Sequence, residues 1–274
     1  MTETMKHFKL RTDLTIKVCE KTLYRIEATK DITKFGVKVG DLGGYIEKEE
    51  NLSGDAWVSG DAQVSGDALV SGNALVYGEA RVSGDALVFG DARVSGNAEV
   101  YGNAEVYGDA WVYGNAQVSG DALVSRNALV YGEARVSGDA LVSGDARVSG
   151  NAEVYGDAEV YGDAEVYGNA QVSGDARVSG NALVFGDAWV SGNAEVYGDK
   201  IEKENDLINI TSNASSYNIT ITPNHIKIGC QYHSKKAWFK FTDKEIIKMD
   251  GEKAVMWWKK WKPILKSICD GLKQ

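Results

Sequence analysis

A six-residue alternation of small, apolar and polar positions governs the middle of the chain. From Ser53 to Val196 the unit [Ser/Tyr/Phe]-Gly-[Asp/Asn/Glu]-Ala-x-Val runs for 24 consecutive copies, and only Arg126 replaces a glycine. A helix is excluded, because a glycine in every unit would cost roughly 1 kcal/mol each and a period of six does not match 3.6. In a strand, Ala and Val lie on one side and x on the other, while Gly followed by Asp or Asn provides a turn. Each unit therefore predicts a short strand and a corner.

A strand this short buries almost nothing alone, so the copies are expected to stack about 4.8 Å apart as a solenoid. The spacing in Val70-Ser71-Gly72-Asn73-Ala74 resembles the hexapeptide repeat of left-handed β-helix proteins, typified by UDP-N-acetylglucosamine acyltransferase. The resemblance implies three hexads, 18 residues, per triangular coil. The expected fold class is thus an all-β solenoid, a left-handed parallel β-helix of about eight coils.

An internal duplication supports the 18-residue coil. The x positions read W Q L L R L R E E over residues 53–106 and again over residues 107–160, and only six of the 54 residue pairs differ. The duplicated length equals three coils, so the duplication lengthens the rod without rotating any face out of register.

Three outward faces follow from this coil. The most apolar face carries Trp57, Leu75, Arg93, Trp111, Leu129, Arg147, Glu165 and Leu183. Trp and Leu on successive coils form an apolar patch larger than a monomer usually exposes. We therefore expect a homo-oligomer, a trimer by the resemblance, formed through Trp57, Leu75, Trp111 and Leu129 or through the C-terminal residues.

The corners form acidic columns. They hold 13 Asp, 9 Asn and 2 Glu, and the most acidic column contains Asp67, Asp85, Asp121, Asp139, Asp157 and Asp175. Three interpretations are open: protection from sideways aggregation, mimicry of a nucleic-acid backbone toward a DNA-binding protein, and cation binding. Cation binding is the least favoured, because the Gly-Gly-x-Gly-x-Asp pattern of calcium-binding solenoids is missing.

The open ends of a solenoid need caps. Residues 1–52 predict a small β cap with a turn at Gly43-Gly44, residues 53–199 form the shaft, and residues 200–274 predict an α+β domain. Its strands are expected in 218–231 and in Ala237-Trp-Phe-Lys-Phe241, with helices at 243–249 and 252–268. The lead-in at residues 39–47, Val-Gly-Asp-Leu-Gly-Gly-Tyr-Ile-Glu, is similar to that of phage and prophage hexapeptide proteins, including the YdcK group of proposed transferases.

The C-terminal block interleaves Trp257, Trp258 and Trp261 with lysines. These tryptophans are candidate binding residues that could stack on nucleic acid or lie on a membrane; the alternative is that they pack a small domain. His225, Cys230 and His233 lack a fourth ligand, so no metal site is predicted.

Charge divides the chain into the same three blocks. The net charge is +1 over residues 1–52, −16 over 53–199 and +6 over 200–274. Three scattered cysteines and the absence of a long apolar segment predict a cytoplasmic protein without disulfides or membrane spans. Direct binding of nucleic acid through the acidic shaft is not expected.

Residues 53–196 contain no His, Lys, Cys or Thr and no inserted loop. Acyltransferases of the resembled fold use a histidine base and a substrate loop, so we assign no catalytic residue and no cofactor and favour a non-enzyme. The expected function is a non-catalytic, phage-type scaffold that presents an acidic, aromatic-studded surface to a protein partner such as a host or defence factor. The alternatives are an acyltransferase and an oligomer that sequesters a small ligand such as a nucleotide.

Overall fold

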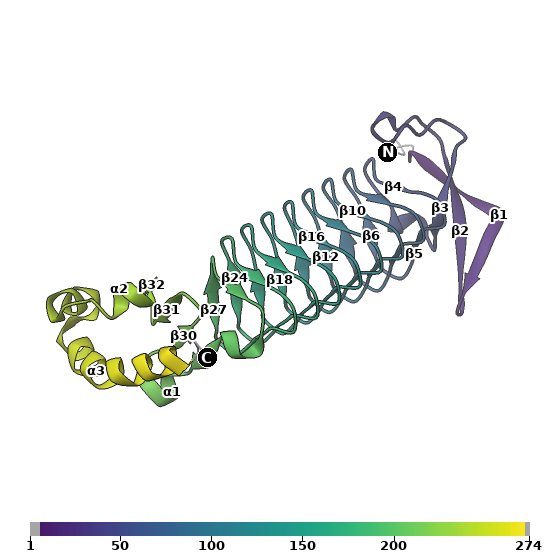
Figure 1. Ribbon diagram of the computed structural model, residues 1–274. Coiled ribbons are helices and arrows are strands. Elements are labelled where there is room, and N and C mark those ends of the chain that lie inside the picture. Colours follow the sequence, from purple (N-terminus) through teal and green to yellow (C-terminus); the bar gives the residue numbers. More distant parts are fainter. Residues whose placement is uncertain (1–5, 272–274) are drawn as a thin grey trace.

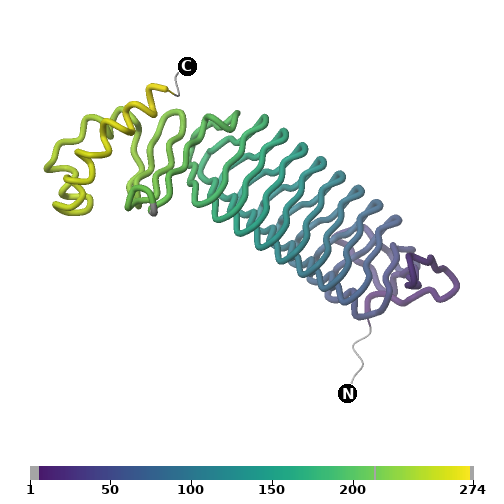
Figure 2. Tube along the Cα trace, turned by 90° about the horizontal axis from the view of Figure 1, so that it is seen from below, coloured from purple at the N-terminus to yellow at the C-terminus, as the bar shows by residue number. Residues whose placement is uncertain are grey.

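The computed structural model describes residues 6–271 as a straight rod with a different cap at each end (Figure 1). Figure 2 shows the successive turns of the chain stacked in one row between the caps. Three parallel sheets form the sides of the rod, and each coil contributes one two- or three-residue strand to each sheet. The predicted β-solenoid is confirmed. It has about nine turns, because Lys200–Ile201 adds one strand beyond the last hexad.

The strands of the three sheets follow the predicted hexad period. The nine-stranded sheet contains β4 (Trp57–Val58), β7 (Leu75–Val76), β10 (Arg93–Val94), β13 (Trp111–Val112), β16 (Leu129–Val130), β19 (Arg147–Val148), β22 (Glu165–Val166), β25 (Leu183–Val184) and β28 (Lys200–Ile201). The shaft strands of the eleven-stranded sheet are β5 (Gln63–Val64), β8 (Arg81–Val82), β11 (Glu99–Val100), β14 (Gln117–Val118), β17 (Arg135–Val136), β20 (Glu153–Val154), β23 (Gln171–Val172) and β26 (Trp189–Val190). The eight-stranded sheet contains β6 (Leu69–Val70), β9 (Leu87–Val88), β12 (Glu105–Val106), β15 (Leu123–Val124), β18 (Leu141–Val142), β21 (Glu159–Val160), β24 (Arg177–Ser179) and β27 (Glu195–Tyr197).

The core of the shaft consists of the repeated Ala and Val side chains. Every repeat Ala and Val between Ala56 and Val196 is at most 1% exposed, while the x residues alternate to the outside. Backbone hydrogen bonds join each turn to the next in the strands and also at the corners, as in Leu75 N to Ala92 O (3.0 Å) and Asp91 N to Gly108 O (2.8 Å). The interior of the shaft is therefore narrow and uniform, and the residues that vary in chemical type from one hexad to the next are the outward ones.

The corner glycines adopt a left-handed backbone conformation. Gly72, for example, has φ +68°, and a Cβ atom there would lie 3.1 Å from the backbone N of Gly90 in the next turn. Because of both the positive φ and the close approach, any residue with a side chain would be unfavourable at this position. Arg126 occupies the same conformation with φ 62°.

The N-terminal cap extends one sheet of the shaft. β1 (Phe8–Val18), β2 (Lys21–Ala28) and β3 (Leu42–Ile46) pair antiparallel, and β3 then pairs parallel with β5. The turn predicted at Gly43-Gly44 is wrong: both glycines are buried within β3. A Cβ at Gly43 would lie 2.5 Å from Val58 O, so these glycines permit close packing of the cap on the first coil. Two short 3-10 helices, η1 (Thr33–Phe35) and η2 (Glu49–Asn51), complete the cap.

The C-terminal domain has its own core. A 3-10 turn, η3 (Glu204–Asp206), leads into the antiparallel sheet β29 (Ile208–Ile210), β30 (Ile219–Ile221), β31 (His225–Ile228) and β32 (Gln231–Ser234), with α1 (Ser212–Ser215) between its first two strands. α2 (Lys235–Trp238) and α3 (Asp243–Gly271) follow. The buried residues of this domain form a hydrophobic cluster separate from that of the shaft.

The two helices predicted at 243–249 and 252–268 are confirmed as parts of α3, which is kinked at Asp250 and Gly251. The strand predicted at Ala237–Phe241 is wrong. Ser234 caps α2 by accepting a hydrogen bond from Ala237 N, and Trp238 is buried against Trp258. Tertiary packing of the aromatic rings thus overrides the strand propensity of the segment. Across residues 6–271, no helix has both the length and the apolar character required to cross a bilayer.

Candidate functional site

The most acidic corner column runs along the whole shaft as predicted by the 18-residue coil. Asp67, Asp85, Asp121, Asp139, Asp157 and Asp175 are all exposed, with Asn103 and Asn193 at the two remaining positions of the column. Lys48 forms an ion pair with Asp67 at 2.5 Å and lowers the pKa of that carboxyl group. Asn103 Nδ2 donates to Asp121 Oδ1 at 2.6 Å.

The other four carboxylates of this column have no hydrogen-bond or ion-pair partner for their side chains among the described residues. They are Asp85, Asp139, Asp157 and Asp175. Backbone hydrogen bonds keep the turns in register, so the carboxylates repeat at the inter-strand spacing of about 4.8 Å. These four carboxylates are thus unpaired negative charges on an ordered backbone, and Asp139, Asp157 and Asp175 lie on three successive turns.

The apolar face is smaller than the sequence predicts, because the N-terminal cap covers its beginning. Trp57 is only 2% exposed and lies beside the ring of His7, which contacts Ala56 O through Nε2 at 2.8 Å. Leu75 is also partly buried against the shaft core. Trp57 is therefore wrong as a residue of an exposed patch: the chain's own cap covers it.

Trp111 and Leu129 lie beyond the cap and remain half-exposed. The indole Nε1 of Trp111 donates to Ser95 Oγ at 2.9 Å, and its ring packs on Tyr113 with the centroids 4.6 Å apart. Lys34 of the cap reaches over the first coils to form an ion pair with Asp91, which lowers the pKa of Asp91. Lys34 and Phe35 form a ledge of the cap at the edge of a hollow of about 420 Å³, which is also lined by Arg93, Trp111 and Leu129.

The C-terminal tryptophans pack the domain. Trp258 is 2% exposed, Trp257 stacks on Trp261 with the centroids 5.7 Å apart, and Trp257 donates to Ser215 O. The prediction that these three rings form a binding surface is wrong for Trp258, because α3 turns it into the core. Lys259 and Lys260 stay exposed between them.

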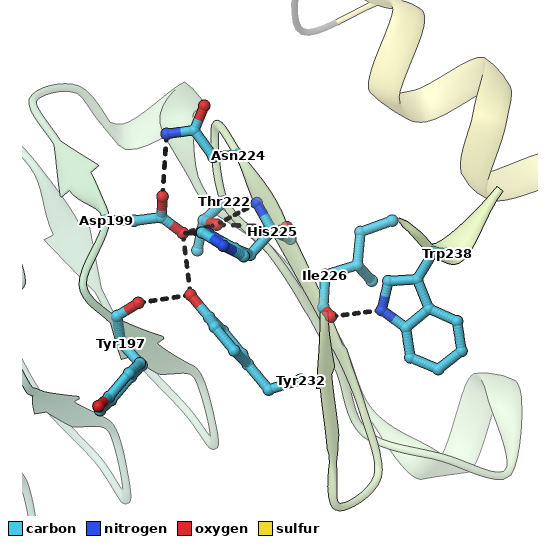
Figure 3. A network of polar contacts seen from close by, with 8 residues as sticks. All are labelled: Tyr197, Asp199, Thr222, Asn224, His225, Ile226, Tyr232 and Trp238. Carbon is cyan, nitrogen blue, oxygen red and sulfur yellow. Dashed lines mark hydrogen bonds and ion pairs between the residues drawn. The ribbon is translucent and has the colours of Figure 1, made fainter. Parts of the chain in front are cut away.

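A buried carboxylate joins the shaft to the C-terminal sheet (Figure 3). Asp199 is 1% exposed and accepts hydrogen bonds from Thr222 Oγ1 and from Asn224 Nδ2 (3.0 Å). The Tyr232 hydroxyl lies 2.5 Å from Tyr197 O and 3.1 Å from Asp199 Oδ2. Burial and the charge of Asp199 raise the pKa of Tyr232. Because polar contacts rather than a shared core join these elements, Asp199 is the centre of the junction.

His225 joins the titratable side chains Asp199 and Tyr232 in this network. Its Nδ1 lies 2.8 Å from Asp199 Oδ2, its ring stacks on Tyr232, and its side chain is 31% exposed. A carboxylate on Nδ1 fixes the proton there and leaves Nε2 as a hydrogen-bond acceptor, which is the arrangement of a general base. A weak sequence signal marks Asp199: it occupies the corner position of a twenty-fifth unit that ends in Lys-Ile instead of Ala-x-Val.

His225, Cys230 and His233 do not converge. Within residues 6–271, no three or more His, Cys, Asp or Glu side chains are placed to hold a metal ion. His233 instead packs edge-on against Trp238 and Phe241.

Comparison with known families gives a match confined to the shaft. The YdcK Beta solenoid repeat matches residues 62–78, 80–96, 116–132, 134–150, 170–186 and 176–192. The starts at 62 and 80, and at 116 and 134, are one 18-residue coil apart, in agreement with the strand register. No curated protein matches the chain. By its strands and its coil, the shaft of this protein is a β-solenoid, and its repeats are similar to the YdcK Beta solenoid repeat.

Proposed function

We propose that this protein is a non-catalytic scaffold, of the phage type, whose shaft presents an acidic surface to a basic protein partner. The observation that supports this most directly is the row of unpaired carboxylates at Asp85, Asp139, Asp157 and Asp175. A host or defence protein that binds nucleic acid fits such a surface, because its basic groove normally receives a chain of regularly spaced phosphates.

The energetics of the column favour a cationic partner. Two carboxylates one turn apart repel each other by about 0.9 kcal/mol in water. The stacked backbone holds them in place, so lysine or arginine side chains of a partner relieve this repulsion on binding. The shaft is already ordered, and the entropic cost of forming the interface is correspondingly small.

The test begins with co-purification from infected cells and identification of the bound protein by mass spectrometry. Replacing Asp85, Asp139, Asp157 and Asp175 by Asn should weaken binding of that protein and reduce its dependence on salt. The matched control replaces Asp61, Asp145, Asp163 and Asp187, which removes the same charge from the other two corner columns. Equal loss in both variants, or salt-independent binding, would contradict the proposal.

We further propose that the protein assembles as a homo-oligomer, a trimer by analogy with other β-helix proteins. The available apolar surface is the part of the face at Trp111 and Leu129, together with the C-terminal domain, where Met256 is 70% exposed. Light scattering at micromolar concentration should give a multiple of the chain mass of 29.6 kDa. A monomer mass would refute this assembly.

An acyltransferase is the second candidate, and the contact between Asp199 and His225 is the observation in its favour. If the protein is an acyltransferase, calorimetry should detect binding of acetyl-coenzyme A. This binding should be lost in the His225→Gln variant and retained in the His233→Gln variant. Binding with this pattern would replace the scaffold proposal.

A further inference from the structure

The hollow beside the N-terminal cap contains an arginine that lacks the partner its equivalents have. The other outward arginines of the strands each lie within 4 Å of a glutamate one turn away. These pairs are Arg81–Glu99 (3.6 Å), Arg135–Glu153 (3.4 Å), Arg147–Glu165 (3.4 Å) and Arg177–Glu159 (3.4 Å). Arg93 is flanked by Leu75 and Trp111 instead and has no ion-pair partner in the described part of the chain.

The 54-residue duplication explains this difference. Arg93 and Arg147 occupy the same position in the two copies. The turn after Arg147 supplies Glu165, whereas the turn after Arg93 begins the second copy and supplies Trp111. The junction of the two copies thus leaves a guanidinium group next to an indole.

A free carboxylate lies at the same place. Asp109 precedes Trp111 at the corner, is exposed, and has no side-chain partner within residues 6–271. Asp91, one turn earlier in the same column, is bound by Lys34. The hollow is therefore left with one unpaired positive group and one unpaired negative group that do not pair with each other.

Apolar side chains line part of the hollow, and Lys34, Asn73, Asp91, Arg93 and Asp109 line the rest. Trp111 is held in place by Ser95 and Tyr113, Leu129 continues the floor one turn further, and Phe35 forms the wall under the ledge of the cap. Its volume of about 420 Å³ lies within the range of about 300 to 1,000 Å³ that is typical of small-ligand sites.

We propose that this hollow binds a zwitterion with a flat apolar body, of the class of an aromatic α-amino acid. The carboxylate of the ligand pairs with the guanidinium of Arg93, its ammonium pairs with Asp109, and its ring packs on Trp111 and Leu129. This site lies on a different face from the acidic column and is independent of the scaffold function.

The probe is L-phenylalanine, titrated against the full chain by calorimetry or by ligand-observed NMR at millimolar concentrations. Two further probes each lack one charge: 3-phenylpropionate has no ammonium, and phenethylamine has no carboxylate. We expect L-phenylalanine to bind and each single-charge probe to bind about tenfold more weakly. Equal binding of all three would show that only the apolar floor is recognised, which would overturn the zwitterion assignment.

Variants locate the site. Arg93→Gln and Asp109→Asn should each lower the affinity for L-phenylalanine about tenfold. The repeat provides matched controls: Arg147 occupies the position of Arg93 in the second copy, and Asp163 stands 54 residues after Asp109, at the corner of the turn that follows Arg147. Arg147→Gln and Asp163→Asn should leave the affinity unchanged. No saturable binding to the unmodified chain, or the same loss in the controls, would overturn the proposal.

Discussion

The corner glycine of each hexad has the strictest conformational requirement of any position in the shaft. A left-handed backbone and a neighbouring turn about 3 Å from a Cβ position together require glycine; a Cβ atom at Gly108, for example, would lie 2.9 Å from the backbone N of Arg126. Arg126 meets the same constraint with a side chain, at φ 62°. A non-glycine residue in this conformation costs about 1 to 2 kcal/mol.

Arg126→Gly should therefore raise the free energy of unfolding by about 1 kcal/mol, measured by chemical denaturation. The duplication supplies the reverse experiment, since Gly72 is the equivalent residue of the first copy. Gly72→Arg should lower the stability by a similar amount. A stabilising effect of Gly72→Arg would show that backbone strain does not govern this position.

Single residues also show where sequence reasoning stops. The alternation of Ala, x and Val places every repeat Ala and Val inside the shaft correctly, because strand periodicity is local. The burial of Trp57 depends on His7, 50 positions away in the chain, and no local pattern contains that contact. The neighbours of Arg93, by contrast, follow from the 18-residue coil, which places Leu75 and Trp111 on either side of it.

At the level of elements, one contact between the N-terminal cap and the shaft is made by a titratable group, the imidazole of His7. Burial lowers the pKa of His7 below its ordinary value, and its neutral ring contacts Ala56 O. In the unfolded cap the histidine titrates near pH 6.5. The cap is thus stabilised above that pH, and its stability falls as the pH drops toward the lower folded-state value.

Lowering the pH from 7 to 5.5 should reduce the protection factors of the amides in β1 and β2, after correction for the slower intrinsic hydrogen exchange at lower pH, while those of the central shaft strands stay unchanged. His7→Gln can still donate a hydrogen bond to Ala56 O but cannot take up a proton. The protection factors of β1 and β2 in this variant should depend much less on pH. A pH response of the same size in this variant would exclude His7 as the cause.

The junction at the other end depends on one buried carboxylate. Asp199→Asn replaces an acceptor oxygen with a donor that faces Thr222, Asn224 and His225. Hydrogen bonds to a charged group contribute about 1.5 to 3 kcal/mol each, so the C-terminal sheet should loosen from the shaft. Faster exchange in β30–β32 with unchanged exchange in β10–β22 would show this. Asp163→Asn, at an exposed corner, is the control and should change neither.

The elements differ in how far the sequence determines them. The regular hexads and the helical segment 243–268 were correctly predicted, because their periods repeat many times. The segment Ala237–Phe241 and the pair Gly43-Gly44 were not, since both are short and are decided by tertiary contacts with Trp258 and Val58. The contacts of Asp199 were also beyond prediction, because its partners come from residues 222–224 and from β31 and β32, all distant from it in the chain.

For the whole molecule, the coil sets the unit of length. Each turn contacts only its neighbours, so the stability of a solenoid is close to a sum over turns. Removing residues 107–160, the second copy, deletes three complete turns and joins Val106 to Tyr161 in the same hexad phase.

This deletion should give a folded protein whose shaft is about 14 Å shorter, at three turns of about 4.8 Å. Small-angle scattering measures the length, and circular dichroism checks that the strand content per residue is retained. The free energy of unfolding should fall, because three inter-turn interfaces are lost. An aggregated or unfolded product would contradict the additive description of the shaft.

The separation between interior and surface has a consequence for how such a protein evolves. Glycine, alanine and valine of each hexad maintain the fold, whereas most x residues and most Asp, Asn and Glu residues of the corners face outward; Trp57 and Asp91, which contact the N-terminal cap, are exceptions. Mutations at the outward positions are therefore nearly free of a stability penalty, and copying whole coils multiplies any useful surface. Selection can therefore change the binding surface of the rod as quickly as its partner changes, while the fold stays the same.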